Sequence, residues 1–99
     1  MNAASQPTSR NDHDRVVLLQ ALKLLHDGYE VRARVEGYFE LPDPINGYRP
    51  DVVAHSPDGQ YVIIEVKKGD VDWPKLEALQ RFASEHPQYE LRVIDAVAA

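Results

Sequence analysis

The sequence predicts a small α/β domain in which a mixed β-sheet is flanked by helices. Three observations support this prediction. Apolar residues recur at helical spacing in two segments, near residues 12–27 and 72–86. Between these segments, three stretches have the alternation or the β-branched composition of strands. A further short apolar stretch follows the second helical segment, so the predicted element order is α, β, β, β, α, β.

Length and composition limit the classes of site that the chain can build. The 99 residues are enough for one domain, expected over residues 12–99 after a polar, flexible tail of residues 1–11. The chain has no cysteine, which excludes disulfides, thiolate zinc sites and cysteine nucleophiles. No apolar run approaches the roughly 20 residues of a membrane span, and the first residues lack the apolar core of a signal peptide, so we expect a cytoplasmic protein. The net charge of −5 argues against generic nucleic-acid binding, although a local basic patch can coexist with it.

The first helix and the first strand follow from two different periodicities. A helix is expected from Asp12 or Asp14 to Asp27, with Asn11 or Asp12 as the cap and Gly28 suited to the stop. Residues 29–36 alternate apolar and charged side chains, which predicts an edge strand. Residues 37–47 contain two prolines and an Asn-Gly pair, which predicts a loop or a ragged hairpin.

A hairpin is the strongest local prediction. Residues 51–55 and 60–67 flank the sequence Ser-Pro-Asp-Gly, in which Gly59 is suited to the left-handed conformation that follows a type I turn. A three-residue loop at 57–59 sets the register, so that Asp51 faces Glu65 on the neighbouring strand.

The sequence contains signals for both ends of the second helix. Asp72 can cap it, Trp73-Pro74 occupies the first turn, and Pro87 ends it. Trp73 is expected to anchor this helix to the sheet. Residues 91–94 are expected to form the last strand.

The predicted register collects three charged side chains on one face of the sheet: Asp51, Glu65 and Lys67. Two carboxylates about 5 Å apart repel each other unless a cation or a shared proton compensates. Carboxylate oxygens suit Mg²⁺ or Mn²⁺, which can hold a phosphate oxygen and lower the pKa of a bound water. Lys67 would then orient the attacking water or stabilise charge on the phosphate.

These residues give the sequence a family resemblance. Arg49-Pro50-Asp51, followed by Glu65-Val66-Lys67, resembles the motif of the PD-(D/E)XK nuclease superfamily, and the resemblance covers roughly residues 12–95. It implies a restriction-endonuclease-like αβββαβ core, metal binding by Asp51, Glu65 and the Val66 carbonyl, and assistance to hydrolysis by Lys67. The compact length looks most like Holliday-junction-resolvase-like or mobile-element endonucleases. The chain departs from the family in the first helix, where many members have a Glu and this chain has only aspartates near the start.

The expected function is therefore hydrolysis of DNA phosphodiester bonds with Mg²⁺ or Mn²⁺, by a homodimer or within a larger complex, because one small domain covers little of a duplex. One alternative is a catalytically inactive module of the same fold, which binds or assembles. Another is an interaction domain unrelated to nucleases. A structural cross-strand ion pair between Asp51 and Lys67, with Glu65 in solvent, is the alternative interpretation of the three residues.

Several other polar residues have a structural interpretation as the default. Lys75 and Gln80 are interpreted as a solvated helix face, with phosphate contact as the alternative. Lys68 and the arginines are surface charges that could instead line a phosphate-binding rim. The four histidines have no metal-ligand spacing, so each is interpreted as a surface or helix-end residue, and no zinc site is expected.

Overall fold

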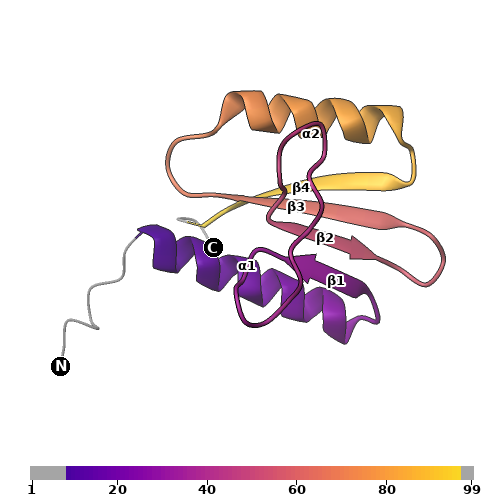
Figure 1. Cartoon of the computed structure of the whole chain (residues 1–99), viewed down its shortest axis with the longest axis horizontal. Coiled ribbons are helices and arrows are strands. Elements are labelled where there is room, and N and C mark those ends of the chain that lie inside the picture. The colour runs from indigo at the N-terminus through magenta and orange to yellow at the C-terminus, as the bar shows by residue number, and fades with distance from the viewer. Residues whose placement is uncertain (1–8, 97–99) are drawn as a thin grey trace.

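A computed structural model describes residues 9–96 of the chain, and the side-chain environments from residue 12. The elements, in chain order, are α1 (Ser9–His26), β1 (Glu30–Ala33), β2 (Val52–His55), β3 (Tyr61–Lys67), α2 (Trp73–Glu85) and β4 (Tyr89–Asp95). The four strands form one sheet in the order β1-β2-β3-β4, with β4 parallel to β3 and the other pairs antiparallel. The sheet lies between α1 and α2 (Figure 1), which confirms the predicted α/β class and the predicted order.

Helix α1 begins earlier than the sequence indicates. It starts at Ser9, so residues 9–11 of the predicted tail are helical, while residues 1–8 lie outside the described part of the chain. The helix ends at His26, and Gly28 follows with φ 93°, as its predicted role as a stop requires. The apolar side of α1 packs on one face of the sheet and forms the main core, whose buried residues are Val16, Val17, Ala21, Leu24, Ala33, Val35, Val52, Ala54, Val62, Ile64 and Val66.

The predicted hairpin and its register are confirmed. Val53 pairs with Ile63, and the chain reverses through residues 57–59, where Gly59 has φ 91°. The Ser56 N–H donates to the Gln60 carbonyl and closes the loop. Strand β1 forms the edge of the sheet next to β2, also as predicted.

Helix α2 covers the other face of the sheet. Asp72 caps it by accepting a hydrogen bond from Lys75 N–H, and Leu76 and Leu79 are buried. The expectation for Trp73 was wrong, because its side chain is 63% exposed. Trp73 is the first residue of the helix, and the buried stripe starts one turn later at Leu76. Within the described residues, neither helix combines the length and apolar character needed to cross a bilayer.

Candidate active site

Asp51 lies directly before β2, and its carboxylate is almost fully buried, with the residue 1% exposed. Its Oδ2 accepts a hydrogen bond from the Val66 N–H at 2.8 Å and lies 3.2 Å from His13 Nε2 on α1. Arg34 Nη1 is 3.9 Å from Oδ1. The Asp51 carboxylate therefore accepts a β3 hydrogen bond that a backbone carbonyl would accept if β2 were longer. It joins the sheet to α1 at this point.

Glu65 on β3 is in contact with the main chain of Asp51. The Asp51 N–H donates to Glu65 Oε1 at 3.2 Å, as expected for a register that continues the hairpin pairing. The other oxygen, Oε2, lies 2.7 Å from Lys75 Nζ on α2. The side chains of Glu65 and Lys75 are 14% and 11% exposed, so this ion pair is shielded from water. The hairpin therefore brings the two predicted carboxylate residues together.

The two carboxyl groups have pKa values shifted in opposite directions. Burial, followed by the neighbouring charge of Asp51, raises the pKa of Glu65, although Lys75 opposes this shift. Burial would also raise the pKa of Asp51, but hydrogen bonds from His13 and Val66 outweigh it and the pKa lies below the usual value. The hydrogen bond to Asp51 is the main cause that raises the pKa of His13 to about 9. A protonated His13 thus faces an ionised Asp51, beside a Glu65 whose charge is unfavourable in this environment.

Lys67 lies on the same strand as Glu65, two residues further on, and its ammonium pairs with another group. Lys67 Nζ is 2.9 Å from Asp95 Oδ2 on β4, and both side chains are about one-third exposed, at 32% and 39%. Among the described ion pairs, Asp51 contacts His13 and Arg34 and has none with Lys67. The alternative interpretation, a structural ion pair between Asp51 and Lys67, is therefore wrong.

Two pockets meet at His13, which lines both of them. One has a volume of about 380 Å³ and is also lined by Glu65, Lys67 and Lys68. The other has a volume of about 620 Å³ and is lined by Arg34 and Arg49 on its cationic side. Acidic side chains line the same pockets, Asp70 and Asp72 the first and Asp14 and Glu36 the second, so both pockets carry mixed charge.

Two of these contacts correct the sequence analysis. His13 is not a simple surface residue, because it binds Asp51, and Lys75 is not on a solvated face, because it binds Glu65. The helical spacing of the apolar residues indicates that both side chains face the protein interior. His13 precedes the buried Val17 by four residues, and Lys75 precedes the buried Leu79 by four, so each lies on the buried side of its helix.

Two further polar residues that the sequence singles out agree more closely with expectation. Gln80 is exposed, as predicted. Lys68 pairs with Asp12 at 2.9 Å, so an aspartate near the start of α1 holds a lysine close to the site.

The donor groups for a metal ion are few. Among residues 12–96, no three His, Asp or Glu side chains are arranged to hold a metal ion together. The oxygen donors at the site are the carboxylates of Asp51 and Glu65 and the backbone of Val66. In a strand, the N–H and C=O of one residue point to the same side. Since the Val66 N–H points at Asp51, the Val66 carbonyl lies on that side of β3 as well.

No protein-family model and no curated protein matches the chain. Among solved structures, the crystal structure of a repair endonuclease from Pyrococcus abyssi is similar, with a TM-score of 0.45 and 17% sequence identity over 84% of this chain. The matched region is 35% of that protein, so the chain spans about a third of its length. A similarity at this level does not assign an activity to the chain.

Proposed function

We propose that the chain is a metal-dependent endonuclease domain of the PD-(D/E)XK kind, which hydrolyses phosphodiester bonds in DNA with Mg²⁺ or Mn²⁺. The observation that carries the proposal is the contact between the main chain of Asp51, directly before β2, and the Glu65 carboxylate on β3. The Asp51 N–H donates to Glu65 Oε1 at 3.2 Å, and burial, followed by the charge of Asp51, raises the pKa of Glu65. Two carboxylates close enough for the charge of one to raise the pKa of the other favour a nearby cation.

The oxygen donors at the site are of the kind that hard divalent cations prefer. Asp51 and Glu65 would hold it with their carboxylates, and the Val66 carbonyl would be a third oxygen ligand. Burial, followed by the charge of Asp51, raises the pKa of Glu65, and a nearby cation would oppose both effects by favouring the ionised carboxylate. When bound, the metal would act as a Lewis acid toward a phosphate oxygen and lower the pKa of a bound water.

The basic side chains near the site would bind the substrate. Lys67 and Lys68 line the pocket that also contains Glu65, and ammonium groups there can donate hydrogen bonds to a phosphate or to a water. Arg34 and Arg49 line the pocket on the other side of His13, where they could contact the neighbouring phosphates of the strand. A homodimer or a larger complex would extend the surface for a duplex.

A cleavage assay tests the proposal directly. Wild type and Asp51→Asn would be incubated with branched, single-stranded and duplex DNA in Mg²⁺, Mn²⁺ or EDTA. Glu77→Gln, at an exposed position on α2, is the matched control for loss of one carboxylate. Wild type and the control should cleave at least one substrate only with metal, and Asp51→Asn should not. Equal cleavage by all three proteins would exclude Asp51 from the site.

A second function has its own supporting observation. The three residues proposed for catalysis already have protein partners: His13 for Asp51, Lys75 for Glu65 and Asp95 for Lys67. This fits a non-catalytic module that keeps the fold for binding or assembly. Thermal unfolding with and without Mn²⁺ separates the two functions, since only a metal-binding site stabilises the folded state by mass action.

A further inference from the structure

A row of side chains crosses all four strands on the α2 side of the sheet. Glu30 pairs with His55, His55 with Tyr61, and Tyr61 with Tyr89. The three rings of this row are stacked. The His55 and Tyr61 centroids are 4.3 Å apart at 14°, and the Tyr61 and Tyr89 centroids are 4.3 Å apart at 11°. The row ends in a carboxylate at β1.

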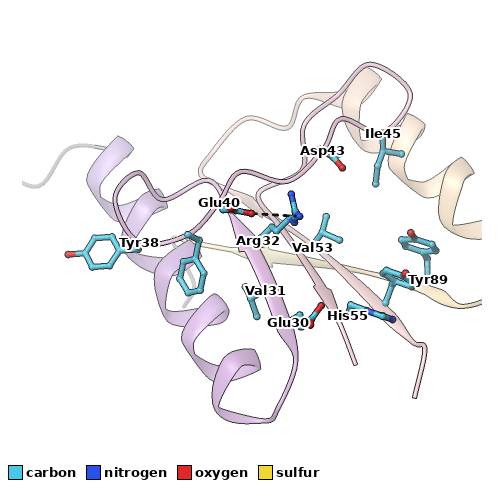
Figure 2. Close-up of a pocket in the computed structure, with 12 residues that line it drawn as sticks. Glu30, Val31, Arg32, Tyr38, Glu40, Asp43, Ile45, Val53, His55 and Tyr89 are labelled. Carbon is cyan, nitrogen blue, oxygen red and sulfur yellow. Dashed lines mark ion pairs between the residues drawn. The ribbon is translucent and has the colours of Figure 1, made fainter. Parts of the chain in front are cut away.

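A pocket of about 670 Å³ lies over this row. Figure 2 shows it between the sheet, which carries His55 and Tyr89, and the segment before β2, which carries Asp43 and Ile45. Val53 contributes an apolar part of the sheet surface. The pocket therefore combines aromatic, apolar and acidic walls.

The charge of this pocket is negative. Three carboxylates line it, those of Glu30, Glu40 and Asp43, against the single cation Arg32. Within residues 12–96, Glu30 and Asp43 have no ion-pair partner. Arg32 and Glu40 are 3.7 Å apart with side chains 53% and 83% exposed, and such a pair contributes little. With Arg32 offsetting one of the three carboxylates, the pocket keeps a net negative charge beside the stacked rings.

We propose that this pocket binds an arginine side chain presented by a basic protein partner. A guanidinium group is planar and weakly hydrated, stacks on aromatic rings and pairs with carboxylates through two hydrogen bonds. His55 offers the ring at the end of the stack, and Glu30 and Asp43 offer the carboxylates. Arg32 of the chain itself directs its guanidinium into this space, beside Glu40 (Figure 2). The net charge of −5 would draw a basic partner toward the molecule.

The same charges argue against a nucleic-acid strand in this pocket, because carboxylates repel phosphates. Tyr61 and Glu65 lie on one face of β3, four residues apart, which is about 13 Å along a strand. The pocket is therefore separate from the candidate active site, and the arginine-binding proposal stands whether or not the chain cleaves DNA.

Titration followed by amide chemical shifts in NMR spectra tests the arginine proposal. The probes are a Gly-Arg-Gly-Arg-Gly peptide, the same peptide with Lys in place of Arg, and a thymidine decamer. The arginine peptide should cause saturable shifts at Glu30, His55 and Tyr61. The lysine peptide should bind about fivefold or more weakly than the arginine peptide. No saturable shifts are expected there for the decamer.

Two variants complete the test. The double variant Glu30→Gln, Asp43→Asn changes two exposed side chains and should retain the fold, with affinity for the arginine peptide lower by about fivefold or more. The matched control is Glu77→Gln, Glu85→Gln on α2, which should bind like wild type. The proposal is overturned by any of three results: no saturation up to about 10 mM peptide, equal affinity for both peptides, or unchanged affinity in the pocket variant. Binding of the decamer at these residues would overturn it too.

Discussion

His13 on α1 and Asp51 before β2 lie 3.2 Å apart, from Nε2 to Oδ2, and this contact connects the first helix to the segment that leads into β2. The pair is mostly buried, with side chains 27% and 2% exposed. A protonated imidazole at this position takes the role of a cation beside Asp51. In the metal-free protein, His13 neutralises Asp51, whereas in the metal-bound protein the metal ion should do so. This difference leads to the first two predictions.

Asp51→Asn should abolish binding of Mn²⁺, because the variant keeps the shape of the side chain and loses the charge that would hold the ion. Isothermal titration calorimetry of wild type should give a heat of binding in the millimolar range of affinity or tighter, at roughly Kd 1 mM or below. The Glu77→Gln variant should match wild type. The same heat in wild type and Asp51→Asn would contradict the assignment of Asp51 as a ligand.

The free energy of unfolding of the metal-free protein should fall as the pH rises from about 6.5 to about 9. The pKa of His13 is raised from 6.5 to about 9 in the folded state. Its stabilising contribution is therefore complete below the lower value and lost as pH rises through the higher one. The loss should be roughly 1–3 kcal/mol, discounted for the partial exposure of the ring. Urea unfolding in EDTA across this pH range measures it, and His13→Gln should flatten the profile. An equally steep profile in His13→Gln would assign the effect to another group.

Lys75→Ala should destabilise the protein by about 1–3 kcal/mol at pH 7, because it leaves the shielded Glu65 carboxylate without its partner. Lys23→Ala, at an exposed position on α1, should cost far less. If Glu65 binds metal, added Mn²⁺ should recover part of the stability that Lys75→Ala loses. Chemical unfolding with and without Mn²⁺ gives both values. A Lys75→Ala protein as stable as wild type would mean that the ion pair is not maintained in solution.

Lys67→Ala should leave the fold and Mn²⁺ binding largely intact while abolishing cleavage of DNA. The ion pair with Asp95 that it removes is partly exposed and contributes at most about 1 kcal/mol. Lys68→Ala is a useful comparison, since its lysine lies in the same pocket but pairs with Asp12. Cleavage should be measured for both variants on the same DNA substrates. Undiminished cleavage by Lys67→Ala would remove Lys67 from the mechanism.

Leu79→Ala should cost about 2–5 kcal/mol, because this side chain is fully buried between α2 and the sheet. Leu22→Ala, on the outer side of α1 where the residue is 43% exposed, should cost much less. Thermal or urea unfolding compares the two variants. Similar losses for both would mean that α2 does not pack on the sheet as described.

Local patterns in the sequence were enough for most of the fold. The turn at residues 57–59 determined the register of β2 and β3, because loop length and turn type leave one pairing for the residues on either side. Asp72 and the apolar spacing that follows it determined the start and the buried side of α2. These are interactions between residues close in the chain, so they can be derived from the order of residues alone. The contact between Asp51 and Glu65 belongs to this group, since it follows from the same register.

The partners of the charged side chains were decided only by the tertiary structure. His13 reaches Asp51 across 38 positions of the chain, and Lys68 reaches Asp12 across 56. Which helix residue meets which strand residue depends on how α1 and α2 are positioned against the sheet, and helical spacing alone gives only the side that each residue occupies. The exposure of Trp73 was decided in the same way, because it depends on where α2 starts relative to the sheet. Side chains far apart in sequence can be paired only when the packing of the helices on the sheet is known.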